Sequence, residues 1–276
     1  MKLVKGMYVC QDVPAIIFDQ GCLKPCLYCG LSHRFFSEET IMATGLENIV
    51  AELLNFKSVY LSPTTDCFLP PNAELTHSLL EAVWKQKEIF TPLVITKQII
   101  PDKTMDLFIK NKHRLVLQIS VPSVNEKVIS ILEPGSALIS DRLEMIKKLT
   151  GAGVPVIAVA MPWFNLDENI NSLPEALASV GVLRTIVATG ILSNRQKQKM
   201  IDSGDEQIKA TALLFNSEIK NGYILPLAER IILLEKITAA FTRAKIKSVI
   251  CTSDNHDLSG SELPLCTQFK HHNFKT

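Results

Sequence analysis

Short apolar runs alternate with amphipathic segments along this chain, and this alternation constrains its fold more than any other feature. Between residues 45 and 56, for example, apolar residues recur at the spacing of one helical face. Six apolar runs are typical of strands, at residues 15–18, 58–61, 93–96, 115–120, 154–161 and 183–188. Repeated strand–helix units favour parallel strands joined by right-handed crossovers. We therefore predict an α/β fold, a partial (β/α)6 TIM-like barrel with a C-terminal extension of helices and a strand.

The predicted barrel spans residues 1–190, with a loop at 20–33 after its first strand. We expect the chain to stay without regular structure from this loop to about Thr44. The extension, 191–276, begins with a polar stretch of helical tendency at 193–220. Because 47% of the 276 residues are hydrophobic, the chain can bury one large core, and we expect the extension to pack on the barrel within the same domain.

Composition and charge argue against several classes of protein. The formal net charge of +1, without a run of five like charges, gives no global case for binding nucleic acid or an anionic membrane. The longest apolar stretch, Val154–Phe164, contains two prolines and falls short of the roughly 20 residues that cross a bilayer. The N-terminus lacks the apolar segment of a secretory signal. We expect a soluble, cytoplasmic protein with no membrane partner.

Three cysteines carry the clearest chemical signal. Cys22, Cys26 and Cys29 follow the first apolar run at a CxxxCxxC spacing, and the seven cysteines of the chain are typical of a metalloprotein in a reducing compartment. Three thiolates can hold a 4Fe-4S cluster and leave one iron open to a ligand. The alternatives are half of a zinc site, for which His33 is the nearest further ligand, and inert buried thiols.

The spacing of these cysteines resembles the signature loop of the radical S-adenosylmethionine superfamily. In that family the amino and carboxylate groups of the methionine moiety chelate the open iron. The resemblance implies that Cys22, Cys26 and Cys29 bind a 4Fe-4S cluster and that the chain also binds S-adenosyl-L-methionine. It further implies that Tyr28, at the aromatic position before the third cysteine, flanks the adenine.

Polar strand ends refine this resemblance. Over residues 16–162 the chain is similar to the spore photoproduct lyase branch of the superfamily, in motifs that appear here as Ser62-Pro63-Thr64-Thr65-Asp66, Ile95-Thr96-Lys97, Gln118-Ile119-Ser120, Leu132-Glu133-Pro134-Gly135 and Arg142-Leu143.

The resemblance assigns cofactor contacts to these motifs. It implies that Lys97 lies near the methionyl carboxylate, that Ser120 lies near the ribose or the carboxylate, and that the turn of Ser62, Thr64 and Thr65 approaches the amino group. It also places Glu133 among the cofactor-binding residues. A solvated lysine, a helix-capping serine and a glutamate at a helix C-terminus are the alternatives.

Two further features concern cysteine chemistry. Pro63 stands where the lyase family has a hydrogen-donating cysteine, so Cys67, four residues later, is the candidate hydrogen donor, with a small buried cysteine as the alternative. Cys251 and Cys266, with histidines nearby, could hold an auxiliary cluster or be structural thiols.

These features predict an enzyme. The resemblance implies that a reduced cluster cleaves S-adenosylmethionine to a 5′-deoxyadenosyl radical, which abstracts hydrogen from a small metabolite, a nucleoside or a peptide. A flavodoxin- or ferredoxin-type protein would supply the electron. The alternatives are repair of a DNA lesion and an iron–sulfur electron carrier without radical chemistry. The strand-end residues Thr65, Lys97 and Ser120 favour an enzyme, since an electron carrier needs no polar-lined pocket.

Overall fold

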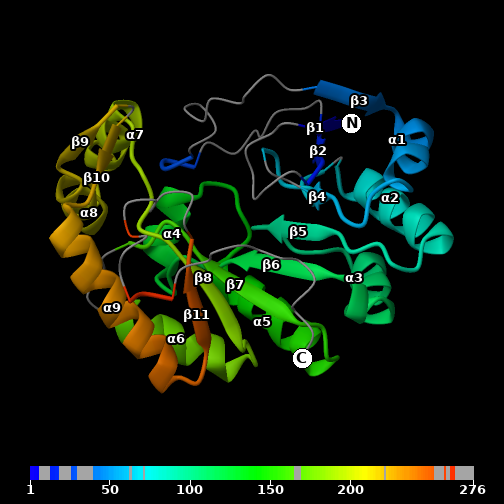
Figure 1. The fold of residues 1–276 in the computed structure, drawn as a ribbon. Coiled ribbons are helices and arrows are strands. Elements are labelled where there is room, and N and C mark those ends of the chain that lie inside the picture. Colours follow the sequence, from blue (N-terminus) through cyan, green and yellow to red (C-terminus); the bar gives the residue numbers. More distant parts are fainter. Residues whose placement is uncertain are drawn as a thin grey trace.

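A nine-stranded sheet, in the order β11-β8-β7-β6-β5-β4-β2-β1-β3, forms the centre of the molecule (Figure 1). The computed structural model describes residues 1–5, 13–18, 26–29, 40–61, 64–70, 72–164, 169–220, 222–251, 258 and 262–264. The parallel strands are β2 (Ala15–Ile17), β4 (Tyr60–Leu61), β5 (Leu93–Thr96), β6 (Val116–Ser120), β7 (Val156–Ala160), β8 (Arg184–Val187) and β11 (Lys247–Ile250). Strands β1 (Lys2–Lys5) and β3 (Thr40–Thr44) extend the sheet by antiparallel pairing.

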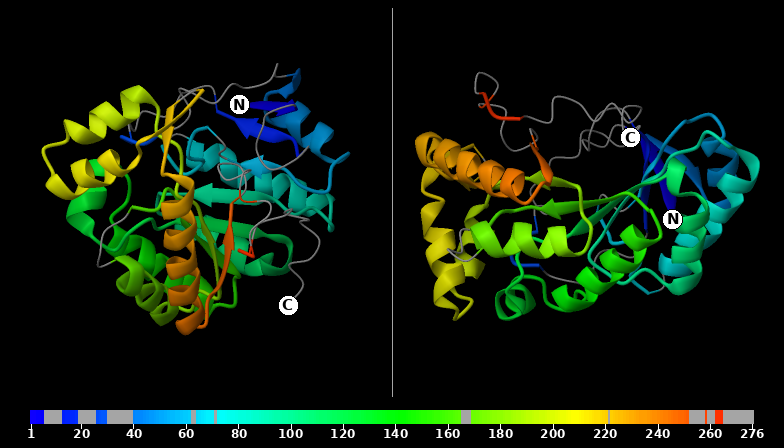
Figure 2. Two further views of the ribbon diagram at one scale, coloured as in Figure 1. Left: turned by 60° about the vertical axis from the view of Figure 1, so that its left-hand side comes forward. Right: turned by 90° about the horizontal axis from the view of Figure 1, so that it is seen from below.

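Helices lie around the outside of the sheet (Figures 1 and 2). They are α1 (Leu46–Leu53), α2 (Asn72–Gln86), α3 (Asp102–Lys110), α4 (Glu126–Leu132), α5 (Ile139–Gly151), α6 (Asn169–Ser179) and α9 (Leu227–Arg243). A smaller group at one side contains α7 (Asn194–Ile201), α8 (Glu206–Leu214) and the hairpin of β9 (Ser217–Ile219) and β10 (Gly222–Ile224). No helix in these ranges is long and apolar enough to cross a membrane.

The two faces of the sheet bury different clusters because side chains alternate along each strand. The main core joins one face to the helices; from β6 it takes Leu117 and Ile119. The buried residues of the second cluster all lie on strands, and Val116 of β6 is one of them. We call the face that carries this second cluster the inner face.

The predicted partial barrel is confirmed. Each expected strand from 15–18 to 183–188 is present, and neighbouring strands pair in parallel. Among the described strands the sheet is open, because its order starts at β11 and ends at β3. Strand β11 pairs with β8, so the predicted C-terminal extension contributes a further parallel strand to the barrel.

Two local predictions were wrong. Residues 40–44, at the end of the predicted loop, are not irregular, since they form β3 and pair with β1. The predicted helical stretch at 193–220 contains α7 and α8 but ends in β9. Strand β3 pairs with β1, about 40 residues earlier in the chain, so that pairing rather than local pattern decides its conformation. Strand β9 forms a hairpin with β10, and each of these strands has only three residues.

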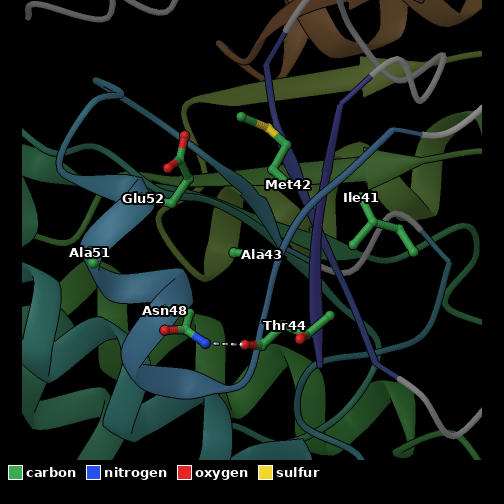
Figure 3. A pocket seen from close by; sticks show the side chains of 7 residues that line it. All are labelled: Ile41, Met42, Ala43, Thr44, Asn48, Ala51 and Glu52. Carbon is green, nitrogen blue, oxygen red and sulfur yellow. Dashed lines mark hydrogen bonds between the residues drawn. The ribbon is translucent and has the colours of Figure 1, made fainter.

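An open pocket of about 550 Å³ lies between β3 and α1 (Figure 3). Residues of these two elements line it, among them Met42, Asn48 and Glu52. The side chain of Asn48 donates a hydrogen bond to the Thr44 carbonyl at 3.1 Å and so holds the start of the helix to the strand. None of these residues belongs to the motifs that the sequence singled out.

Candidate functional site

The segment Cys26–Cys29 is fixed against the barrel by main-chain and side-chain contacts. The amide of Leu27 donates to the carbonyl of Leu132 at 2.9 Å, and the amide of Cys29 donates to that of Cys26 at 3.1 Å. The buried Tyr28 ring packs against Phe164, with ring centroids 5.4 Å apart. The segment therefore has a defined place next to the C-terminal end of α4.

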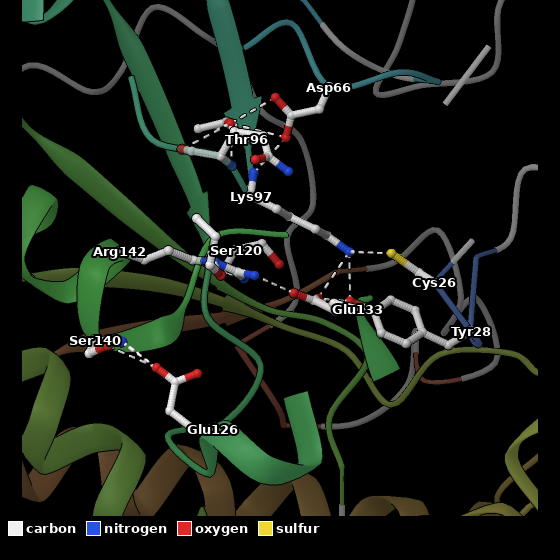
Figure 4. Close-up of polar contacts among 12 residues, drawn as sticks. Cys26, Tyr28, Asp66, Thr96, Lys97, Ser120, Glu126, Glu133, Ser140 and Arg142 are labelled. Atoms are coloured by element: carbon white, nitrogen blue, oxygen red, sulfur yellow. Dashed lines mark hydrogen bonds and ion pairs between the residues drawn. The ribbon is translucent and has the colours of Figure 1, made fainter. Parts of the chain in front are cut away.

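Lys97, Tyr28 and Glu133 meet at the carboxyl end of β5 (Figure 4). The ammonium of Lys97 donates to the Tyr28 hydroxyl at 2.6 Å and lies 3.0 Å from Oε1 of Glu133. The Tyr28 hydroxyl donates to the same Oε1. The ammonium also lies 3.9 Å from Sγ of Cys26, so two of the predicted cofactor residues contact the cysteine segment or its tyrosine.

Arg142 completes this network from α5. Its Nη2 lies 2.7 Å from Oε2 of Glu133, and its Nη1 donates to the Ser120 carbonyl at 2.8 Å. Both side chains of this pair are 0% exposed. Glu133 is thus held between two cations, and both of its oxygens are occupied by protein groups. The sequence assigned no role to Arg142, although a charged residue among Ile139, Met145 and Ile146 on the buried face of α5 was a signal of a buried ion pair.

The charges of this network reinforce one another. Burial opposes ionisation of Glu133, but Lys97 and Arg142 outweigh it and hold the pKa of this carboxyl below its usual range. Burial likewise opposes the charge of Lys97, yet Glu133 and Tyr28 raise its pKa well above the usual value. Burial first, and Glu133 next, raise the pKa of the Tyr28 hydroxyl. At neutral pH the site therefore combines an ammonium, a carboxylate and a neutral phenol.

Asp66 fixes the backbone of Lys97. Its carboxylate accepts hydrogen bonds from the amides of Lys97 at 2.7 Å and Phe68 at 2.9 Å, and from the Thr96 hydroxyl at 2.8 Å. Burial raises the pKa of this carboxyl, although these hydrogen bonds oppose the shift. The sequence placed Asp66 in the polar turn but did not predict that it ties the turn after β4 to the end of β5.

Two predicted cofactor hydroxyls are buried without a partner. Within the described ranges neither Thr64 Oγ1 nor Ser120 Oγ makes a hydrogen bond, and Thr65, next to Thr64 in sequence, is buried as well. Buried polar groups are nearly always paired, so unpaired hydroxyls at a strand end suit a bound ligand. These groups, with the Lys97 ammonium, fit a cofactor that carries carboxylate, amino and hydroxyl groups.

Other predicted residues lie elsewhere. Cys67 is 0% exposed within the main core, and its carbonyl accepts a hydrogen bond from Thr76 at 2.9 Å. Cys22, Ser62, Pro63 and Cys266 lie outside the described residues. Within those residues no three His, Cys, Asp or Glu side chains gather as metal ligands, and a site that requires Cys22 is not tested by this.

No family model matches the chain. In sequence the chain is 29% identical over 133 residues to the uncharacterized protein ORF301 of Acidianus two-tailed virus. The aligned region covers 46% of this chain and 44% of the viral protein. The chain therefore spans less than half the length of this curated relative.

Solved structures share the fold. Spore photoproduct lyase complexed with dinucleoside spore photoproduct superposes with a TM-score of 0.62 at 17% identity, over 86% of this chain and 75% of the lyase. Streptococcus suis SuiB bound to S-adenosylmethionine gives 0.56 at 17% identity, over 83% of this chain and 48% of SuiB. SuiB bound to its precursor peptide SuiA gives 0.57 at 18% identity, over 86% of this chain and 48% of SuiB. The chain thus has the fold of these radical S-adenosylmethionine enzymes, and the resemblance to the spore photoproduct lyase branch is confirmed at the level of the fold.

Proposed function

We propose that this protein is a radical S-adenosylmethionine enzyme. The observation that carries the proposal is the contact of Lys97 with Tyr28 and with Sγ of Cys26, which brings the predicted carboxylate-binding cation to the predicted cluster loop. The family resemblance implies that Lys97 and Cys26 lie close together, although the two residues are about 70 positions apart in the sequence. An electron carrier has no need of a cation and free hydroxyls beside its cluster.

The residues present fit the two cofactors. Cys22, Cys26 and Cys29 would hold the 4Fe-4S cluster, and Lys97 would meet the carboxylate of S-adenosylmethionine as a charge-assisted partner. The unpaired hydroxyls of Thr64 and Ser120 would form hydrogen bonds with the polar groups of S-adenosylmethionine, as donors or as acceptors. When bound and reduced, the cluster would supply the electron that cleaves the cofactor to a 5′-deoxyadenosyl radical.

Glu133 has a positioning role in this proposal. Because it is fully enclosed and both of its oxygens are engaged, it acts on the cofactor through Lys97 and Tyr28. It keeps the ammonium charged and directed at the cysteine segment, while Arg142 keeps Glu133 ionised. Tyr28 would present its ring to the adenine while its hydroxyl stays in the network.

The neighbours act on different substrates, a dinucleoside lesion in one case and a precursor peptide in the other. For this chain we propose hydrogen abstraction from a small metabolite, a nucleoside or a peptide, with a flavodoxin or ferredoxin as electron donor in the cytoplasm. Lesion repair is the second candidate. Two observations argue against lesion repair: Pro63 stands at the place of the family's hydrogen donor, and Cys67 is fully buried. Efficient multiple-turnover reversal of spore photoproduct would reinstate it.

Metal content tests the cluster assignment. Anaerobically reconstituted protein should contain about four iron and four sulfide per chain, bound by the three-cysteine loop. The triple variant Cys22→Ala, Cys26→Ala, Cys29→Ala should lose both, whereas Cys251→Ala should retain them. Full iron and sulfide content in the triple variant would refute the assignment. A content of about eight that falls by half in Cys251→Ala would instead show an auxiliary cluster.

A further inference from the structure

Cys251 places a thiol on the inner face of the sheet, at the carboxyl end of β11 (Figure 1). Its amide donates a hydrogen bond to the Val187 carbonyl at 2.8 Å, so the parallel pairing with β8 continues one residue beyond the strand. The half-buried side chain packs against the cluster of the inner face. Of the other described cysteines, Cys26 and Cys29 belong to the proposed cluster loop, and Cys67 belongs to the main core. Among these four thiols, the inner face is therefore lined by Cys251.

The register of the sheet relates Cys251 to Ser120. One row of paired residues crosses the inner face from β6 to β11 and consists of Ser120, Val159, Ile186 and Val249. Cys251 stands two residues beyond Val249 on the same face, because side chains alternate along a strand. Three strand spacings of about 4.8 Å put β11 about 14 Å from β6 along the sheet. Ser120 and Cys251 thus stand on two sides of the same carboxyl edge, with β7 and β8 between them.

Buried hydroxyls without a partner indicate a ligand along this edge. Ser120 is 1% exposed, shares the inner face with Val116, and its Oγ makes no hydrogen bond within the described chain. The same holds for Oγ1 of Thr189, which is 0% exposed and stands two residues beyond β8, the strand that pairs with β11. Buried hydroxyls are nearly always paired, so these two favour bound molecules that extend from the cofactor site at Ser120 to the neighbourhood of Cys251.

We infer that Cys251 is the catalytic thiol that returns a hydrogen atom to the substrate-derived radical, an inference that rests on the proposed function. The 5′-deoxyadenosyl radical takes a hydrogen atom from a C–H bond of the substrate and becomes 5′-deoxyadenosine. The carbon radical left behind takes the hydrogen atom of the Cys251 S–H bond, so that a new C–H bond forms and a thiyl radical remains on Sγ. One electron from the flavodoxin- or ferredoxin-type donor and one proton from water restore the thiol.

The chemistry of a thiol suits this step. An S–H bond is weaker than an aliphatic C–H bond, so the transfer of its hydrogen atom to a carbon radical is favourable. Each turnover consumes one S-adenosylmethionine, two electrons and one proton, and the substrate regains the hydrogen atom that it lost. The reaction class is therefore a rearrangement without net oxidation of the substrate. Because Cys251 lies at the opposite end of the parallel strands from the turn after β4, the hydrogen atom arrives from another side than in the lyase family.

An affinity label tests whether Cys251 faces the nucleoside site. The reagent 5′-chloroacetamido-5′-deoxyadenosine carries an alkylating group on the carbon where the radical would form, and a homologue with a longer linker extends its reach. On anaerobically reconstituted protein, one of the two reagents should alkylate Cys251 at least about tenfold faster than chloroacetamide does, because binding brings it close to the thiol. Excess S-adenosylmethionine should suppress this labelling. Peptide mass mapping locates the label, and the control Cys67→Ala should be labelled as the wild type is.

The isotope content of 5′-deoxyadenosine tests the hydrogen transfer itself. In D₂O the thiol carries deuterium, and with no substrate present the 5′-deoxyadenosyl radical can take it directly. With titanium(III) citrate as a reductant that contains no thiol, the wild type and Cys67→Ala should form 5′-deoxyadenosine that carries deuterium. Each molecule that Cys251→Ser forms should carry none above background, since an O–H bond is too strong to give its hydrogen to a carbon radical.

The outcomes separate this inference from the proposed function. Cleavage of S-adenosylmethionine with no preferential label on Cys251, or with equal deuterium content in the wild type and Cys251→Ser, would overturn the inference and leave the proposed function intact. Loss of half of the iron in Cys251→Ala would also overturn it, because an iron-bound thiolate has no hydrogen atom to donate. A label on Cys251 that S-adenosylmethionine suppresses, in a reduced protein that forms no 5′-deoxyadenosine, would refute the proposed function and with it the hydrogen transfer, while Cys251 would still line the nucleoside site.

Discussion

Replacing Glu133 by glutamine should destabilise the protein strongly, because Glu133 is the shared counter-charge of two cations. The carboxylate lies 3.0 Å from the Lys97 ammonium and 2.7 Å from the Arg142 guanidinium. At an effective dielectric constant of about 20, each pair contributes about 5–6 kcal/mol of Coulomb energy, most of which offsets desolvation. Because Glu133→Gln leaves two cations without their counter-charge, we expect a net loss of about 3–5 kcal/mol.

Thermal and denaturant unfolding at pH 7 measure this loss against a matched control. The variant Glu81→Gln breaks an exposed i,i+4 pair with Lys85 at 3.1 Å, which is worth at most about 0.5 kcal/mol. We expect Glu133→Gln to lower the free energy of unfolding by several times the change in the control. Equal changes in the two variants would refute the role of Glu133 as the centre of a buried ion network.

The pH dependence gives a second test of the same network. The pKa of Glu133 is lower in the folded protein than its ordinary value of 4.5, because Lys97 and Arg142 outweigh the effect of burial. Its contribution to stability is therefore complete above pH 4.5 and is lost as the pH falls through the folded pKa. The stability difference between wild type and Glu133→Gln should shrink at acid pH. A difference that stays constant, or grows, as the solution is acidified would contradict the assigned charge state.

Three further predictions concern the cofactor, the strand end and nucleic acid. Lys97→Ala should weaken S-adenosylmethionine binding in calorimetry by about 10- to 150-fold, the effect of a charge-assisted bond of about 1.5–3 kcal/mol, while Lys103→Ala, an exposed lysine of α3, should not. Asp66→Asn should lower the free energy of unfolding by about 1–2 kcal/mol, because an amide cannot accept all three hydrogen bonds. The control Asp106→Asn, at an exposed position, should leave the free energy of unfolding unchanged. Equal free energies of unfolding in the two variants would refute the anchoring role of Asp66. Duplex DNA should bind weakly and be released by moderate salt, and tight binding that resists salt would contradict the small phosphate-contacting surface expected from the net charge.

The sequence was sufficient for the barrel because its pattern is local. Strand β7 is a continuous apolar run and β5 is largely apolar, and α1 shows its buried face through the spacing of Ile49, Val50 and Leu53. Parallel strands must end at one edge, which is why the sequence predicts that Lys97 and Ser120 lie near each other. Strand β3 escaped prediction because β1, its partner among the described strands, is some 40 residues away.

The inner organisation of the site could not be predicted in the same way. Glu133 and Arg142 are close in sequence, but nothing in their spacing shows that both are fully buried or that Lys97, 36 residues before Glu133, shares the same carboxylate. Such networks depend on how helices α4 and α5 pack over the strand ends.

Cleavage of S-adenosylmethionine by the reduced, reconstituted protein tests the central claim most directly. The account predicts methionine and 5′-deoxyadenosine in equal amounts, slowly even without substrate, with the reaction abolished in the Cys22, Cys26, Cys29 triple variant and strongly reduced in Lys97→Ala at subsaturating cofactor. A fully iron-loaded and reduced wild type that forms no 5′-deoxyadenosine, or a Lys97→Ala variant that forms it at the wild-type rate at the same cofactor concentration, would contradict the account.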